Sequence, residues 1–369
     1  MTGCRRSFTE QSRQSFHKMK SAMAHNRVLT YCDNAGVVHT RRWAAKCLAV
    51  LLCLACLVSF SACSERKADP EEELDPSSIE YLLKKPNLKV LDIGNSYSVG
   101  VFSLLPAVVK YCKADVNDMC LYELYRSGSS FRTWCNLYED KDTQHFSFYR
   151  VIGNLTVNVP YGVYPERDGS VFRRVLTEVE WDLIIIHQVS TYAPYYDSWA
   201  GEGIGGFLEQ LLGIIRQHQP RAKIGFMLVH SYWDCYSGNK ERSSFERWQL
   251  IANSVQQLQR DYDIQFIIPY GTAVENLRFS SLNNDYDLTK DGTHLEYGLS
   301  QYTAACCLFE SLITPRTGIS CLGSPALIDV SDTESLYPSI SVNKKNALIA
   351  QKAAILAVKD MFHCNNPEN

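Results

Sequence analysis

Five short apolar runs, each followed by a segment with helical patterning, constrain the fold of this chain more than any other feature. They are residues 88–93, 119–125, 181–188, 223–230 and 264–269. The third run, WDLIIIHQ, begins with a continuous apolar stretch instead of an alternating one, which is typical of a strand buried on both faces. Buried strands that alternate with helices predict a doubly wound parallel sheet, with right-handed crossovers that place helices on both faces.

The remaining segments agree with one domain over residues 79–369. Helices are predicted over residues 99–112, 171–178, 206–217, 245–262, 272–277, 297–312 and 346–362. Residues 148–159 are expected to form a hairpin or an excursion, and residues 319–341 a loop. The chain has 369 residues, is 46% hydrophobic and has a formal net charge of -3, so it can bury a large core and carries no basic footprint for nucleic acid.

The segment before this domain is laid out like the leader of an exported protein. Basic residues within 41–46 precede the apolar run CLAVLLCLACLVSF, and Ser61-Ala62 stand directly before Cys63. This order predicts a signal peptide over residues 41–62. The residues before Cys63 resemble a bacterial lipobox, which implies cleavage there and a lipid on Cys63. A transmembrane anchor is the alternative, but a run of about 14 residues is short of the roughly 20 needed to span a bilayer.

Two polar segments flank this leader. Residues 1–40 have no hydrophobic pattern and are interpreted as an extension from a start site placed too far upstream. Residues 63–78 are charged, contain an acidic run and two prolines, and are predicted to form a tether. We therefore expect an exported lipoprotein, periplasmic or on the outer membrane or cell surface, whose membrane partner is reached through Cys63.

Cysteine spacing predicts no metal site. Six of the 14 cysteines lie at or before Cys63, which leaves eight in the folded part. An exported protein permits disulfides, but their pairing does not follow from the spacing. Because no C-x-x-C pair follows the leader, we expect no zinc and no other metal.

Several polar residues follow the apolar runs directly, and parallel strands bring their carboxyl ends to one edge. Ligands bind beyond that edge in folds of this kind. The residues that we expect to share this rim are Ser96, Gly128, His187, Gln188 and His230.

A serine nucleophile on this rim would need a base, and the base an orienting group. Ser96 lies in Gly94-Asn95-Ser96, between the first strand and a helix whose N-terminus favours developing negative charge. A helix cap at Ser96 or Ser98 is the alternative. Asp291 precedes His294 by three residues, so its carboxylate can accept the imidazole Nδ1–H through a turn. A turn that simply caps the next helix is the alternative for this pair.

The other rim residues are candidates to bind an oxyanion. Gly128 lets a backbone N–H approach a substrate oxygen, although an ordinary turn glycine would look the same. Gln188 offers a side-chain amide. Because side chains alternate along a strand, His187 should face the opposite way, and either residue could point into the site or pack in the core.

Taken in chain order, these motifs resemble the SGNH/GDSL hydrolase superfamily. Its members carry a Gly-Asp-Ser block after the first strand, a glycine after the second, a Gly-x-Asn-Asp block after the third and Asp-x-x-His near the C-terminus. The matching positions here are Gly94-Asn95-Ser96, Gly128, His187-Gln188 and Asp291-Gly292-Thr293-His294. The resemblance covers about residues 88–312 and is greatest to a bacterial branch with Asn in the first block and Gln in the third.

The resemblance implies a three-layer αβα sandwich with a five-stranded parallel sheet of the flavodoxin-like type. It implies Ser96 as nucleophile, His294 as base and Asp291 as the orienting acid, without a metal or organic cofactor. The oxyanion would be bound by the backbone N–H groups of Ser96 and Gly128, with Gln188 as third donor and His187 as its alternative.

Aromatic residues in STYAPYYDSW and HSYWDCY, after the third and fourth strands, suit either stacking on sugar rings or anchoring of the loops. We expect Asn95, His187, Tyr192 and Trp233 to contact the substrate. The sequence thus predicts a serine ester hydrolase that removes O-acetyl or other short acyl groups from a glycan or small molecule. Because Asn95 and Gln188 depart from the superfamily pattern, a non-catalytic glycan-binding lipoprotein is the alternative. A lipase or thioesterase is a third reading.

Overall fold

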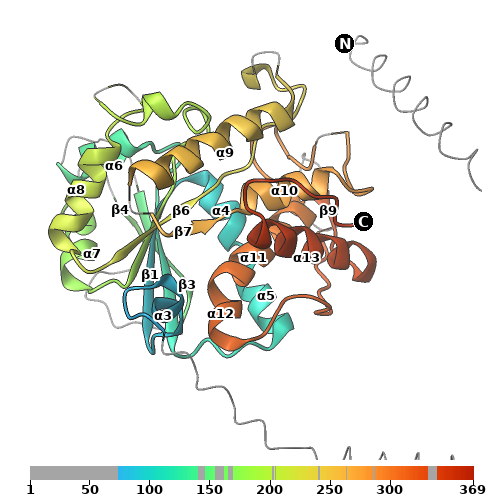
Figure 1. Cartoon of the computed structure of the whole chain (residues 1–369), viewed down its shortest axis with the longest axis horizontal. Coiled ribbons are helices and arrows are strands. Elements are labelled where there is room, and N and C mark those ends of the chain that lie inside the picture. Colours follow the sequence, from blue (N-terminus) through green and yellow to red (C-terminus); the bar gives the residue numbers. More distant parts are fainter. Residues whose placement is uncertain are drawn as a thin grey trace, which may run out of the picture. The chain divides into compact units, whose positions relative to one another are not determined.

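The centre of the computed structural model is a seven-stranded sheet in the order β4-β3-β2-β1-β5-β6-β7 (Figure 1). Its strands are β1 (Leu88–Gly94), β2 (Met119–Tyr125), β3 (Phe146–Ile152), β4 (Gly162–Tyr164), β5 (Leu183–Ile186), β6 (Lys223–Met227) and β7 (Phe266–Ile268). Strands β2, β1, β5, β6 and β7 are parallel, and β3 and β4 pair antiparallel at the β2 edge. The predicted five-stranded parallel sheet is therefore confirmed, and a hairpin enlarges it.

The structure describes residues 74–139, 146–153, 162–164, 169–201, 203, 205–239, 242–262, 264–285, 287–330 and 339–369. The predicted extension over residues 1–40, the signal peptide over 41–62, Cys63 and most of the tether lie outside these residues. Within them, no helix combines the length and the apolar character that crossing a membrane requires. Residues from Glu73 to Asn369 form one compact unit.

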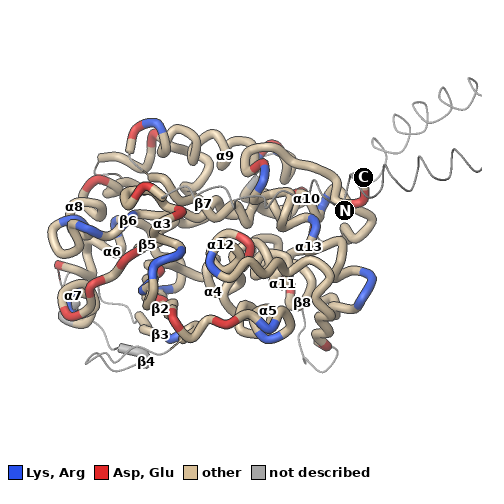
Figure 2. The backbone as a smooth tube through the Cα atoms, turned by 60° about the horizontal axis from the view of Figure 1, so that its bottom comes forward, with Lys and Arg blue, Asp and Glu red and all other residues tan. Residues whose placement is uncertain are grey.

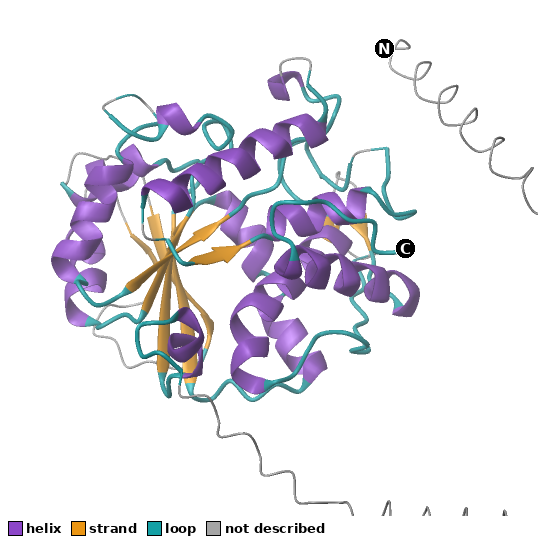
Figure 3. Cartoon of the chain, in the orientation of Figure 1, coloured by secondary structure: helices purple, strands orange, loops and turns teal. Residues whose placement is uncertain are grey.

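Helices cover both faces of the sheet, as the fold class requires. One layer contains α6 (Phe131–Tyr138), α7 (Gly169–Glu178), α8 (Leu208–His218) and α9 (Ser244–Asp261). The other contains α4 (Ser96–Phe102), α5 (Leu105–Cys112), α10 (Tyr270–Arg278), α11 (Leu299–Leu308) and α13 (Lys344–Lys359). Figure 3 shows the strands between these two groups of helices. Every side chain of β5 is buried, which explains its uninterrupted apolar sequence.

Smaller elements lie outside the three layers. They are α3 (Ile79–Lys84), the 3-10 turns η1 (Tyr196–Ser198) and η2 (Ser237–Asn239), the π-helical turn η3 (Phe309–Ile313), α12 (Thr314–Thr317), and the paired short strands β8 (Tyr297–Gly298) and β9 (Ser339–Ile340). The predicted loop 319–341 thus ends in β9.

Two predicted helices differ from the observed ones for identifiable reasons. The single helix expected over 99–112 is divided into α4 and α5, because Pro106 stands in the first turn of α5 and is favoured there but not within a helix. The helix expected over 297–312 begins only at Leu299 and passes into the π-helical turn η3. Helix α6 was not predicted, although Ser130 and Thr133 form a capping box at its start.

Residues of both charge signs are spread along the described part of the chain. Figure 2 shows Lys and Arg segments interspersed with Asp and Glu segments along the described backbone. Among the described cysteines other than Cys235, all are free thiols and most are buried. Burial raises the pKa of Cys120 to about 11, so this thiol stays protonated at neutral pH and packs as an apolar side chain.

Candidate active site

The structure brings Ser96, His294 and Asp291 together at the carboxyl edge of the sheet. His294 Nε2 lies 2.9 Å from Ser96 Oγ, and His294 Nδ1 lies 2.7 Å from Asp291 Oδ2. Ser96 is the first residue of α4, directly beyond β1. The two hydrogen bonds form a continuous line from hydroxyl to imidazole to carboxylate, which is the geometry by which a base activates a serine.

The Asp291 carboxylate is held by its own turn. Its Oδ1 accepts from the backbone N–H of Thr293 at 3.0 Å and of His294 at 2.8 Å, and from Thr293 Oγ1 at 2.9 Å. Partial burial acts to raise the pKa of Asp291, but these backbone hydrogen bonds and the bond to His294 outweigh it and lower the pKa to about 2. Asp291 is therefore ionised at neutral pH, so His294 Nδ1 donates to it and Nε2 is left to accept a proton from Ser96.

Asn95 forms the turn that presents Ser96. It is the N-cap of α4, and its Oδ1 accepts from the Tyr97 N–H at 3.1 Å while its Nδ2 donates to the Ser129 carbonyl at 3.0 Å. An asparagine is thus accommodated where the resemblance has aspartate, since the cap needs only an acceptor oxygen. The capping role that the sequence suggested for a serine belongs to Asn95.

The loop that carries His294 is tied to the helix that carries Ser96. Tyr97 Oη donates to the Thr293 carbonyl at 2.8 Å, and His230 Nε2 lies 2.7 Å from the same oxygen. The rings of Tyr97 and His230 stack with centroids 4.3 Å apart. Because a carbonyl only accepts, His230 is a donor here through Nε2–H. The sequence placed His230 on the rim, and His230 lines the hollow beside Ser96; its Nε2 is occupied by the bond to the Thr293 carbonyl.

Gly128 lies beside the nucleophile turn with its backbone exposed. The segment 126–129 is joined to β1 by the Arg126 N–H, which donates to the Gly94 carbonyl at 3.2 Å, and by Ser129 Oγ, which donates to the same carbonyl at 3.1 Å. Gly128 has φ +63, where a side chain would be strained. Gly128 is not among the residues that line the hollow beside Ser96, so the backbone N–H groups of Ser96 and Gly128 stay the predicted oxyanion donors.

Gln188 does not serve as a third donor in this structure, which corrects the prediction for it. Strand β5 ends at Ile186, and the Gln188 side chain turns away: its Nε2 donates to the Gly205 carbonyl at 2.7 Å and its Oε1 accepts from the Val189 N–H at 2.9 Å. His187 is buried, and its Nε2 accepts from the Asn95 N–H at 3.4 Å. Burial lowers the pKa of His187 to about 4, so it stays neutral. Both residues support loops around the site.

A hollow of about 480 Å³ opens beside the Ser96 hydroxyl. Its lining comes from β2, α4, α11, the segment after β6 and the segment between α10 and α11: Ser96, Tyr97, Val99, Gly100, Ser103, Tyr125, His230, Lys290, Asp291, His294, Leu295, Tyr297 and Gln301. A hollow of this size fits one or two sugar rings or a small ester.

The four residues predicted to contact substrate are not in this lining. Asn95 and His187 are buried behind the nucleophile turn. The Tyr192 ring packs over Gly205, where an added Cβ would clash with it. The Trp233 N–H donates to the Gly292 carbonyl at 2.9 Å, so its backbone supports the turn that holds Asp291 and His294. The aromatic residues of these two loops include clear anchors, because Trp199 and Tyr232 are buried.

The segment from β1 through α12 matches a known family. The model of the domain of unknown function DUF4886 matches residues 89–321, which include Ser96, Asp291 and His294. The chain belongs to the DUF4886 family. A search of curated proteins finds no match to this chain.

One solved structure shares the fold of this DUF4886 chain, and others show a weaker likeness. A DUF4886 family protein from Bacteroides uniformis ATCC 8492 is 22% identical, with a TM-score of 0.58 over 76% of this chain and 97% of that chain. A protein from Slackia heliotrinireducens, provisionally assigned as an SGNH hydrolase, is 11% identical, with a TM-score of 0.38 over 63% of this chain and 98% of that chain. A provisionally assigned acylhydrolase from Bacteroides fragilis NCTC 9343 is 12% identical, with a TM-score of 0.34 over 65% of this chain and 92% of that chain. The DUF4886 structure shows that a solved member of the family has this fold, and the resemblance to the SGNH superfamily stays a prediction.

Two carboxyl groups lie buried beneath the nucleophile turn, and sequence reasoning missed both. Asp92 on β1 is paired in register with Glu123 on β2, and both side chains are buried. A Cβ on Gly94 would clash with Asp92 Oδ2, Ser98 Oγ and His187 Nε2, so these groups converge on that glycine. The signal in the sequence is a single acidic residue in each of two mostly apolar strands.

Glu123 is linked to the turn through Ser98. Ser98 Oγ lies 2.7 Å from both the Asn95 carbonyl and Glu123 Oε1. Because one hydroxyl has one proton and the carbonyl can only accept, protonated Glu123 can supply the proton of the second bond. Burial raises the pKa of Glu123 to about 7, against the smaller lowering effect of the Ser98 bond.

We expect Glu123→Gln to flatten the pH dependence of stability between about pH 4.5 and pH 7. The unfolded Glu123 ionises near 4.5 but the folded one only near 7, so its contribution is fully present below 4.5 and is lost as the pH rises through 7. A Gln side chain at this position can donate to Ser98 Oγ, so both hydrogen bonds of Ser98 are kept, and Gln does not titrate. The difference in unfolding free energy between wild type and variant should change by about 3 kcal/mol across this window. Urea unfolding from pH 4.5 to 8 measures it, with exposed Glu80→Gln as control; parallel curves for wild type and Glu123→Gln would contradict the assignment.

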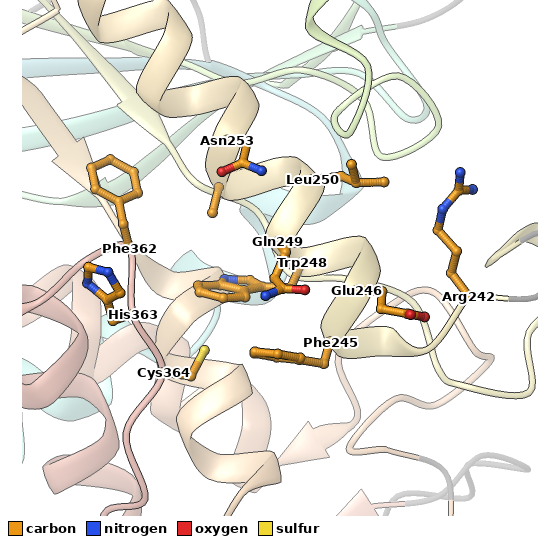
Figure 4. Close-up of a pocket in the computed structure, with 11 residues that line it drawn as sticks. Arg242, Phe245, Glu246, Trp248, Gln249, Leu250, Asn253, Phe362, His363 and Cys364 are labelled. Atoms are coloured by element: carbon orange, nitrogen blue, oxygen red, sulfur yellow. The ribbon is translucent and has the colours of Figure 1, made fainter.

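A second hollow of about 610 Å³ lies between α9 and the C-terminal segment. Figure 4 shows Phe245 and Trp248 from α9 facing Cys364 across it. Burial raises the pKa of the Cys364 thiol far above its usual range, so this thiol is protonated at neutral pH, and the described residues that line the hollow include no serine or threonine. Within the described part of the chain, no cluster of three His, Cys, Asp or Glu side chains is arranged to hold a metal. The hollow beside Ser96 is therefore the candidate active site.

Proposed function

We propose that this DUF4886 protein is a serine ester hydrolase that removes O-acetyl or other short acyl groups from a glycan. The observation that carries the proposal is the Ser96–His294–Asp291 hydrogen-bonded line, with distances of 2.9 Å and 2.7 Å, at the mouth of a hollow. A serine, a histidine and an aspartate joined in this order form the arrangement by which enzymes activate a serine as a nucleophile.

In the proposed reaction, Ser96 Oγ attacks the ester carbonyl carbon while its proton moves to His294 Nε2. The carbonyl oxygen becomes an oxyanion within reach of the Ser96 and Gly128 backbone N–H groups, and Asp291 stabilises the imidazolium. When the tetrahedral species collapses, the proton on His294 goes to the departing alcohol, which leaves an acyl group on Ser96. Water, deprotonated by His294, then releases the carboxylic acid and restores the hydroxyl.

The lining of the hollow supports a polar substrate. Hydroxyl, amide and ammonium groups from Ser103, Tyr125, Gln301 and Lys290 line the hollow beside apolar groups such as Val99 and Leu295, whereas a lipase would need a long apolar channel for the acyl chain. Residues 41–63 of the sequence support the further proposal that the enzyme is exported and anchored through a lipid on Cys63, where it would meet extracellular glycans.

Covalent labelling tests this proposal directly. A fluorophosphonate probe should form one adduct on Ser96, in the tryptic peptide 90–110, and fragmentation separates this site from Ser98 and Ser103 in the same peptide. The same preparation should hydrolyse 4-nitrophenyl acetate faster than 4-nitrophenyl octanoate. Absence of both adduct and turnover would favour the non-catalytic glycan-binding reading, and a preference for octanoate would favour a lipase.

A further inference from the structure

We propose that the hollow beside Ser96 selects substrates that carry an anionic group, such as the carboxylate of a uronic acid, and that Lys290 recognises the anion. This inference rests on the proposed function for the reaction and adds a substrate class to it. The anion could belong to the alcohol part of the ester or to the acyl part, and the experiment below distinguishes the two.

Lys290 is held in the hollow beside the catalytic loop. Its backbone N–H donates to the His294 carbonyl at 2.9 Å, which fixes its position relative to the base. Its Nζ donates to Tyr297 Oη at 3.0 Å and lies 4.3 Å from the centre of the Tyr297 ring. A lysine side chain has four flexible carbons, so these two contacts determine where its charge is placed.

The charge of Lys290 is not neutralised within the described part of the chain. No described Asp or Glu lies within ion-pair distance of its Nζ. Asp291 also lines the hollow, but its two oxygens are occupied by His294 and Thr293. Among the described lining residues, Lys290 is the only Lys or Arg. An ammonium has three donors, and one of them reaches Tyr297, so two remain for a ligand.

Gln301 supplies further donors to the same hollow. It is 8% exposed, and its Oε1 accepts from Ser103 Oγ at 3.2 Å. Its amide nitrogen donates to no residue in the described ranges. An ammonium together with a side-chain N–H₂ group is a suitable set of donors for a carboxylate, and charge-assisted hydrogen bonds are stronger than neutral ones.

Kinetics with matched esters tests the selection. The neutral ester is 4-nitrophenyl acetate; 5-acetoxy-2-nitrobenzoate carries a carboxylate on the leaving group, and mono-4-nitrophenyl succinate carries one on the acyl group. For at least one anionic ester, the ratio of its kcat/KM to that of the neutral ester should fall about tenfold in Lys290→Met and further in Lys290→Glu. Comparing ratios between variants cancels the intrinsic reactivity of each ester.

The control is Lys84→Met, which removes an exposed lysine on α3 before the amino end of β1 and should leave both ratios unchanged. Added salt should weaken the preference of the wild type, since screening reduces charge recognition. If both ratios are the same in wild type, Lys290→Met and Lys290→Glu, Lys290 selects no anion and the inference is wrong.

A binding measurement separates this inference from the proposed function. In isothermal titration, glucuronate should bind the full-length wild type more tightly than glucose does, and Lys290→Met should abolish the difference. If the protein hydrolyses no ester but binds glucuronate through Lys290, the proposed function fails and the anion site stands. If it hydrolyses esters without charge preference and does not distinguish the two sugars, the function stands and the anion site fails.

Discussion

Ser96→Ala is expected to lower kcat for 4-nitrophenyl acetate by about 10³- to 10⁶-fold, the range found when a serine nucleophile is removed from a triad. The imidazole of His294 lies 2.9 Å from the hydroxyl that would be lost, and among the described residues no other side-chain hydroxyl lies within hydrogen-bond distance of its Nε2. The acyl-enzyme route is thereby closed. Stopped-flow and steady-state release of 4-nitrophenolate measure the loss.

Ser103→Ala is the matched control, because Ser103 lines the same hollow but is bonded to Gly100 and Gln301 instead of a histidine. It should change kcat far less than Ser96→Ala does. A Ser96→Ala protein that kept more than a tenth of the wild-type kcat would show that Ser96 is not the nucleophile.

Arg278→Met is expected to lower the free energy of unfolding by about 3–5 kcal/mol. Arg278 forms a buried ion pair with Glu275 on α10, and both side chains are almost fully buried, at 4% and 2% exposed. Its guanidinium also donates to Ser231 Oγ at 2.5 Å and to the Asp287 carbonyl at 3.0 Å, so it joins the loop after β6 to the loop after α10. Without it, Glu275 would be an uncompensated charge in the core. Urea denaturation of the full chain measures the change.

Two companion variants test the cause of this loss. Arg221→Ala breaks the ion pair with Glu180, whose side chains are both 82% exposed, and should cost at most about 1 kcal/mol. The double variant Glu275→Leu with Arg278→Met removes both charges and should recover much of the stability, since the cost comes mainly from the unpaired carboxylate. A double variant as unstable as Arg278→Met alone would indicate that lost packing is responsible.

The parallel sheet could be predicted from the sequence because each of its strands is covered by helices on both faces. Continuous burial produces short apolar runs such as LIII in β5, and these are visible without any partner strand. The antiparallel hairpin at the β2 edge is harder to predict from the sequence. Strand β3 includes Tyr149 and Arg150, which are exposed, so the apolar signal is interrupted.

The candidate triad could be predicted because its members occupy positions that topology alone brings together. Ser96 follows β1, and Asp291 and His294 share one turn before α11. The prediction of Gln188 as an oxyanion donor was wrong because β5 ends at Ile186. Beyond that residue the chain turns, and the alternation of side chains along a strand no longer predicts where a side chain points. The Asp92–Glu123 pair depends on strand register, which single-strand patterns do not contain.

The two hydrogen bonds of the candidate triad differ in how they depend on the fold. Asp291 and His294 are three residues apart and can meet within one turn, whereas His294 and Ser96 are 198 residues apart and meet only when the sheet edge is assembled. Slight loosening of the molecule would separate the serine from its base while the acid–base pair stayed whole. Loss of turnover on mild heating or in low denaturant should therefore precede the loss of helical circular dichroism, which would make enzymatic activity a more sensitive reporter of damage to this protein than its secondary structure.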